Sequence, residues 1–193
     1  MARPRNFNED QVLDIAIGVF REKGYEGTST EDLVSAMGIG RQSLYGAFGD
    51  KRSLYLAALR RYNTQSVTEL LDVGRGASSP MKAIEAILIH FVRHHGRPEA
   101  AACMGVNAIC EFGTSDEDVL SITRQSGKLL EQSLARWINE ARGKGEIDKT
   151  IEPKAAAQFV AAALTALKVA ARGGAAPATS RNIVAYTLRS LSN

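Results

Sequence analysis

The sequence of 193 residues contains little cysteine, few aromatic residues and little net charge. Its two cysteines are too few for a disulfide scaffold and are typical of a reducing compartment. Aromatic residues make up only 6% of the chain, and a formal net charge of +3 is too small to indicate a nucleic-acid partner without a local concentration of charge. A chain of this length buries roughly 70% of its unfolded surface, so apolar packing suffices to hold the fold.

Long hydrophobic runs are absent as well. The longest apolar stretch without a charged residue, 155–167, contains Gln158 and falls short of the ~18 residues that a membrane-spanning helix needs. The N-terminus leads into polar sequence instead of the apolar core of a secretion signal. We therefore predict a cytoplasmic protein with no membrane-spanning segment.

What the sequence does contain is a helical period along its whole length. Apolar residues, 45% of the total, recur at spacings of three and four, and signals for strands are nearly absent. This pattern predicts an all-α fold. Helices are expected over about 8–24, 30–38, 41–48, 50–71, 81–95, 100–111, 114–143, 153–171 and 180–191.

Cap and turn residues mark the expected ends of these helices. Asn8 is placed to cap the first helix, and the glycine turn 74–76 is expected to end the fourth. Thr114 and Glu117 have the spacing of a capping box, and Ser180 is expected to cap the last helix.

The segment 30–48 has the layout of a helix-turn-helix, in which two short helices cross steeply. Gly38 tolerates the positive φ that the turn requires, and Ile39 supplies an apolar plug beneath it. Arg41, Gln42 and Ser43 then lead the outer face of the second helix, which is suited to a DNA major groove. An ordinary helical hairpin with a solvated outer face is the alternative that this pattern leaves open.

Three motifs in order connect this segment to a known family. They cover about residues 7–62 and read Gly24-Tyr25-Glu26-Gly27-Thr28-Ser29-Thr30-x-x-Leu33, Met37-Gly38-Ile39 and Ser43-Leu44-Tyr45-x-x-Phe48-x-x-Lys51-x-x-Leu54. Together they resemble the DNA-binding domain of the TetR family of transcriptional regulators. The resemblance implies about nine helices, a helix-turn-helix DNA-binding domain over 1–50, and a helical ligand-binding and dimerisation domain over 51–193.

The resemblance also implies roles for individual residues. Tyr45 and Lys51 match positions that contact phosphate, which suits a phenol hydroxyl and an ammonium group. Gly40 stands where Ser or Thr is common, and Ala47 where His is common, so base contacts are expected to concentrate on the first turn of the recognition helix. The predicted DNA-binding residues are Thr30, Arg41, Gln42, Ser43, Tyr45, Lys51 and an N-terminal arm of Arg3 and Arg5.

The C-terminal part of the chain is expected to bind a small-molecule effector of unknown identity. Bulky side chains interspersed with a few polar groups are candidates to line its cavity, although core packing explains each of them as well. The alanine-rich stretch 155–166 permits close helix approach, so the last two helices are expected to form a homodimer interface, with packing inside one chain as the alternative. The cavity candidates are Phe91, Cys103, Asn107, Cys110, Phe112, Trp137 and Phe159.

The cysteines and histidines leave several interpretations open. Cys103 and Cys110 are seven residues apart, which on one continuous helix is two turns or ~10.5 Å, too far for a disulfide. Buried thiols are the simplest interpretation, and a thiol sensor or a soft-metal site with His94 or His95 are the alternatives. His90 and His94 also have the i, i+4 spacing of a metal-binding pair. No standard zinc spacing occurs, and we predict no metal and no cofactor.

These features predict a DNA-binding transcriptional regulator and not an enzyme, since no pairing of a nucleophile with a base stands out. The expected protein is a homodimeric repressor that a small molecule releases from a palindromic double-stranded DNA operator. A regulator that senses thiols or metals through Cys103 and Cys110 is the first alternative. A small helical enzyme or carrier that uses the same cavity is the alternative from another class, and turnover of a substrate would distinguish it.

Overall fold

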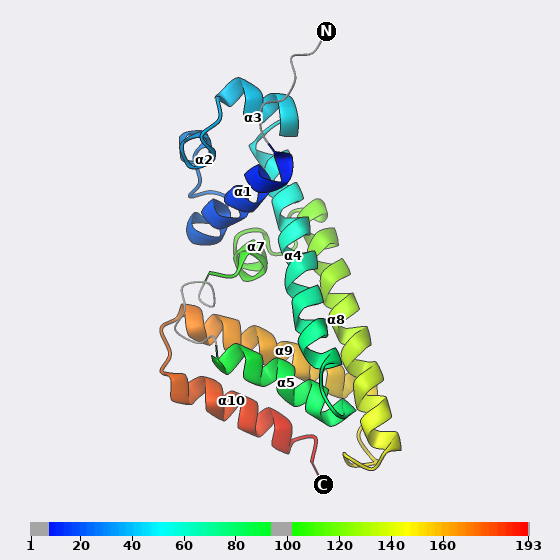
Figure 1. The fold of residues 1–193 in the computed structure, drawn as a ribbon. Coiled ribbons are helices and arrows are strands. Elements are labelled where there is room, and N and C mark those ends of the chain that lie inside the picture. The colour runs from blue at the N-terminus through cyan, green and yellow to red at the C-terminus, as the bar shows by residue number, and fades with distance from the viewer. Residues whose placement is uncertain (1–7, 94–101, 193) are drawn as a thin grey trace. The chain divides into compact units, whose positions relative to one another are not determined.

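The computed structural model describes residues 8–93 and 102–192, and in these ranges every regular element is an α-helix. The predicted all-α fold is therefore confirmed. Arg3, Arg5, His94 and His95 lie outside the described residues. The helices, labelled as in Figure 1, are α1 (Glu9–Lys23), α2 (Thr30–Met37), α3 (Arg41–Phe48), α4 (Lys51–Arg75), α5 (Pro80–Arg93), α7 (Met104–Phe112), α8 (Glu117–Gly143), α9 (Pro153–Arg172) and α10 (Pro177–Arg189).

Contacts within the chain group these helices into two compact units. The N-terminal unit combines the residues up to Thr64 with Met104–Thr123, so it holds α1 to α3, the first half of α4, α7 and the start of α8. The C-terminal unit combines Gln65–Cys103 with Arg124–Asn193. This grouping differs from the predicted division between residues 50 and 51, because buried side chains of α4 and α7 share one core with those of α1 to α3.

The core of the N-terminal unit draws on each of its helices. Phe20 of α1 and Leu33 of α2 are fully buried, and Leu44 of α3 is 1% exposed. Tyr55 of α4 and Met104 of α7 join the same cluster. α7 thus completes a core that the first half of the sequence begins.

The C-terminal unit packs α5 against α9 and α10, and the later parts of α4 and α8 contribute to the same core. Gly74 of α4 approaches the Trp137 indole so closely that a Cβ at this position would overlap the ring. α4 continues through Gly74 and ends at Arg75, inside the glycine turn 74–76 that was predicted to end it and slightly beyond the expected bound near Leu71. The glycine serves helix packing at this position.

Several helix starts follow local signals in the sequence. The Asn8 side chain accepts a hydrogen bond from the amide of Asp10 at 2.9 Å, which confirms the predicted cap of α1. At the start of α4, Asp50 accepts from the amide of Ser53 at 2.6 Å, and this bond lowers the pKa of the Asp50 carboxyl. Pro153 occupies the first position of α9, where a missing amide proton costs nothing.

Two predicted caps are wrong. α8 starts after Asp116, whose carboxylate accepts from the amide of Val119 at 3.1 Å, so Asp116 takes the place expected for Thr114. A carboxylate one residue before the helix reaches the first-turn amides better than a hydroxyl farther away. α10 begins at Pro177, whose fixed φ suits a first helical position, so Ser180 lies buried inside the helix.

Candidate nucleic-acid interface

The turn between α2 and α3 has the geometry that the sequence predicts. Gly38 lies in the left-handed region, at φ 65° and ψ 24°, and Ile39 is half-buried against the core of the N-terminal unit. At the other end of α2, Ser29 and Asp32 form a capping box. A hydrogen bond from Lys23, together with those from Ser29, holds the pKa of the Asp32 carboxyl well below its usual range. Both ends of α2 are therefore fixed, which sets where α3 begins.

α3 turns one side into the core and the other into solvent. Leu44 is 1% exposed, whereas Arg41, Gln42 and Ser43 are all exposed. Gly40 precedes the helix and makes no side-chain cap hydrogen bond, so no cap covers the first-turn amides. A helix N-terminus with uncapped amides and a cation beside it favours an anion such as a phosphate.

Two predicted DNA-binding residues from different helices contact each other. The hydroxyl oxygens of Thr30 on α2 and Tyr45 on α3 lie 2.7 Å apart, and either group can donate the hydrogen bond. Both side chains are half-buried. The bond therefore fixes the direction of the Tyr45 phenol at the outer edge of the helix-turn-helix.

Arg41 has a partner that the sequence pattern did not indicate. Its guanidinium donates to the Glu31 carboxylate of α2. Both side chains are exposed, and exposed ion pairs stabilise a fold little because water screens them. Arg41 can exchange this partner for another acceptor at small cost in free energy.

The basic residues between 41 and 61 differ in their interaction partners. The Arg52 guanidinium lies 3.0 Å from the Asp116 carboxylate. The hydrogen bond from the Val119 amide and the one from Arg52 both lower the pKa of the Asp116 carboxyl. Lys51 instead holds its ammonium nitrogen 4.3 Å from the centre of the Tyr25 ring. The start of α4 therefore carries a cation held by an aromatic ring.

The residues predicted to line an effector cavity are spread over both units. In the N-terminal unit, the Asn107 amide donates to the backbone oxygen of Arg21 at 3.1 Å, and Phe112 belongs to an aromatic cluster with Tyr25 and Tyr55. Cys110 is exposed on α7. These contacts agree with the alternative interpretation, in which Asn107 and Phe112 pack in the core and do not line a cavity.

The other cavity candidates belong to the C-terminal unit. Trp137 is buried against α4, Phe91 is half-buried beside the core, and Phe159 is 52% exposed. Cys103 is buried and lies just before α7, which begins at Met104. The assumption that both cysteines share one continuous helix is therefore wrong, and neither forms a disulfide.

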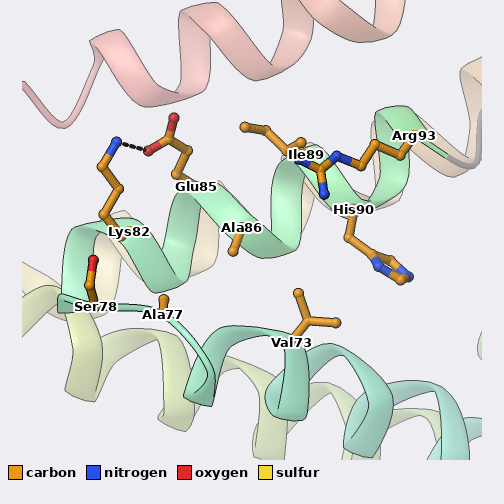
Figure 2. Close-up of a pocket in the computed structure, with 9 residues that line it drawn as sticks. All are labelled: Val73, Ala77, Ser78, Lys82, Glu85, Ala86, Ile89, His90 and Arg93. Carbon is orange, nitrogen blue, oxygen red and sulfur yellow. Dashed lines mark hydrogen bonds and ion pairs between the residues drawn. The ribbon is translucent and has the colours of Figure 1, made fainter.

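A hollow that sequence analysis missed lies between the end of α4 and α5. Its volume is about 390 Å³. Figure 2 shows Val73 of α4 and Ala86 of α5 pointing toward each other across it, with His90 and Arg93 farther along α5 and the Lys82–Glu85 ion pair at the other end. The full lining is Val73, Ala77, Ser78, Lys82, Glu85, Ala86, Ile89, His90 and Arg93.

Two general features of the described residues bear on the expected partners. Residues 8–93 and 102–192 contain no group of three His, Cys, Asp or Glu side chains that could hold a metal ion. α9 is 20 residues long with a mean hydropathy of 1.3 over its most apolar window, so by length and composition alone it could cross a membrane. The charge-free stretch 155–167 lies inside this helix, between Lys154 and Lys168.

Comparison with known proteins relates this geometry to a family. The sequence model of bacterial regulatory proteins of the tetR family matches residues 12–58. The uncharacterized HTH-type transcriptional regulator YezE of Bacillus subtilis (strain 168) is 35% identical over 149 residues, which are 77% of each chain. The HTH-type transcriptional repressor ComR of Escherichia coli (strain K12) is 26% identical over 191 residues, which cover 97% of this chain and 90% of that repressor.

One similar solved structure contains DNA. It is a cysteine variant of the TetR family transcriptional regulator CifR in complex with 26-bp double-strand operator DNA. The two chains are 27% identical and match with a TM-score of 0.84 over 98% of this chain and 100% of that one. The similarity therefore extends from the helix-turn-helix through the later helices, and the chain belongs to the TetR family of bacterial transcriptional regulators.

Proposed function

We propose that this regulator is a homodimeric repressor that binds a palindromic operator and is released from it by a small molecule. The observation that carries the proposal is the outer face of α3, where exposed side chains and uncapped amides present hydrogen-bond donors to solvent. Donors of this kind recognise base edges and phosphates. The proposed function involves no catalysis and operates in the cytoplasm.

The base and phosphate contacts are assigned by side-chain chemistry. Arg41, Gln42 and Ser43 are placed to read base edges, because they lead the exposed first turn of α3. Tyr45, oriented by Thr30, and the ammonium of Lys51 are placed to contact phosphates. Arg3 and Arg5 complete the proposal as a basic arm on the DNA backbone or in the minor groove.

A homodimer is supported by the outer face of α9. Phe159 and Val169 are each 52% exposed, and exposed alanines at 155, 162 and 166 continue the same face at spacings of three and four. Tyr186 on α10 is 67% exposed as well. An apolar stripe flanked by small residues suits close packing against a second copy of the same helix across a two-fold axis. Two-fold symmetry in turn requires a palindromic operator.

Release requires an effector that favours one geometry of the dimer over another. Two recognition helices fit adjacent half-sites only when they are ~34–36 Å apart, one turn of DNA. The hollow between α4 and α5 is one place where a small molecule can act (Figure 2). Of the cavity candidates predicted from the sequence, Phe91, Cys103 and Trp137 belong to the C-terminal unit and are kept as a second proposed lining.

Selection of bound fragments from genomic DNA tests this function directly. We expect enrichment of a palindromic duplex, and light scattering should show two chains bound to it. A duplex with one half-site scrambled should bind much more weakly, because one α3 helix loses its bases. Selection that yields no palindrome, or a single chain on the selected duplex, would contradict the proposal.

A second candidate is release by thiol oxidation, which rests on the exposure of Cys110 on α7. Oxidants reach exposed thiols and add polar atoms to them. The burial of Cys103 limits this route to one readily accessible thiol in the described structure. Substitution of both cysteines distinguishes the two candidates, as discussed below.

A further inference from the structure

Tyr25 lies in the turn that follows α1, and its ring is enclosed on several sides. The ring centre is 5.0 Å from that of Tyr55 on α4 and 5.4 Å from that of Phe112 on α7. The ammonium nitrogen of Lys51 lies 4.3 Å from the same ring centre. Tyr25 therefore stands between α7 and the proposed phosphate-binding cation of α4.

α7 also holds the backbone of this turn. The amide of Tyr25 donates to the Glu111 carboxylate at 2.9 Å. Gly24, at φ 73°, makes room for that carboxylate, since a Cβ there would overlap it. Glu111 thus fixes the backbone of Tyr25, while its neighbour Phe112 packs against the ring.

Lys51 differs from nearby cations in how it is held. Arg52 and Arg61 are paired with carboxylates, which offset their charge. An aromatic ring attracts a cation through its quadrupole and leaves the net charge of the pair positive. The ring also occupies only one side of the ammonium, whose three N–H donors allow a second partner. The Lys51 side chain is therefore restrained and still able to bind an anion.

We propose that Tyr25 is a positioning residue for Lys51, and that α7 fixes Tyr25 through Glu111 and Phe112. The inference rests on the proposed contact between Lys51 and a DNA phosphate. A lysine side chain loses rotamer freedom when it binds a phosphate, and a ring that restrains it beforehand reduces that loss. A displacement of α7 that breaks the Glu111 and Phe112 contacts would loosen Tyr25, so the phosphate contact depends on a helix from the later part of the sequence.

The test compares Tyr25→Leu, which removes the ring, with Tyr25→Phe, which keeps it. Both are made in the full chain, and binding to a fluorescent duplex selected by the wild-type protein is measured over a range of salt concentrations. We expect Tyr25→Leu to bind about two- to fivefold more weakly, with a reduced salt slope, because a ring contact with a cation contributes that much. Tyr25→Phe should match the wild type in both.

A double-mutant cycle separates positioning from folding. In a Lys51→Met background, which should itself lower the salt slope by about one, Tyr25→Leu should have no further effect on binding. Tyr62→Leu is the matched control, because Tyr62 also lies against a cation, Arg21 at 5.4 Å, and should leave the salt slope unchanged. Tyr25→Met provides a second variant without the ring if Tyr25→Leu does not fold.

Two results would overturn the inference, and they differ in meaning. Equal weakening by Tyr25→Leu with and without Lys51 would show that the ring acts on the fold and not on the cation. A wild-type affinity and salt slope for Lys51→Met would instead remove the proposed phosphate contact, and the positioning role with it. The proposed function would remain, because the base contacts of α3 would still account for specific binding of the selected duplex.

Discussion

The outer faces of α3 and α9 differ in almost every property except helical conformation. α3 exposes Arg41, Gln42 and Ser43 in its first turn, whereas α9 exposes Phe159 and Val169 with small alanines between them. Water solvates the first face well and the second poorly. The difference indicates that the two faces suit different partners: an anionic, hydrogen-bonding partner for α3 and an apolar partner for α9.

The largest expected effect comes from placing a charge on the apolar face. Ala162→Asp should yield monomers, because an unpaired carboxylate between closely packed helices costs several kcal/mol, which weakens the dimer by at least about a thousandfold. Operator affinity should fall with it. Light scattering checks the oligomeric state, and Thr68→Asp on α4, also exposed, is the control that should stay dimeric.

Ala163 sharpens this test because it lies beside Ala162 but is only 8% exposed. Ala163→Asp should unfold the C-terminal unit and not merely separate two chains, because its carboxylate would be buried within one chain. A dimer that persists in Ala162→Asp would place the interface away from the α9 face and break the comparison.

Removing the leading cation of α3 should have the next largest effect. Arg41→Ala is expected to cost about 1–3 kcal/mol of operator binding and to relax base preference at one position of each half-site, if Arg41 reads a guanine. Competition between selected and altered duplexes measures both. Arg60→Ala, which removes an exposed cation from α4, should change affinity little; an equal loss in both variants would argue that charge alone matters.

A glycine in the C-terminal core offers a prediction on stability. Gly74→Ala should destabilise the protein by about 1–3 kcal/mol, because the new methyl group meets the Trp137 indole. Thermal unfolding measures this. Gly127→Ala on α8 is the matched control: a Cβ there meets open space, and alanine favours a helix interior by up to ~1 kcal/mol over glycine. Similar melting temperatures for both variants would contradict the close contact.

The smallest expected effect concerns the thiols. Cys103→Ser combined with Cys110→Ser should leave operator binding and effector release unchanged, because neither side chain lies on the proposed DNA-binding face. Some loss of stability is expected from Cys103, which is 5% exposed. Stoichiometric peroxide that releases the wild type from its operator while the double variant stays bound would favour thiol sensing.

Helix ends were predictable wherever one residue acts on its own neighbours. Asn8 caps α1 and Gly38 ends α2 as expected, because both effects depend on the local backbone. The glycine turn 74–76 also ends α4 as expected, but the packing of Gly74 against Trp137 could not be predicted, because the two residues are far apart in the chain. Thr114 failed because Asp116 competes for the same amides and sits closer to them.

The candidate site was predictable in position but not in its partners. The first turn of α3 follows from the spacing around Gly38, so the exposure of Arg41 could be anticipated. Its ion pair with Glu31, and the bond between Thr30 and Tyr45, depend on how α2 and α3 cross. No pattern within either helix records such contacts, and the same holds for the spread of the cavity candidates over two units.

The discontinuous N-terminal unit has a consequence for synthesis on the ribosome. A nascent chain that has reached Thr64 contains α1 to α3 and part of α4, but it lacks Met104, Ala108 and Phe112, which complete the core. Apolar surface on Tyr55 and its neighbours must stay open to water until α7 emerges, and exposed surface of this kind attracts chaperones or other unfinished chains. The part of the protein that is translated first is therefore finished late, so a transcript cut short before α7 would yield a chain prone to aggregate instead of a working DNA-binding fragment.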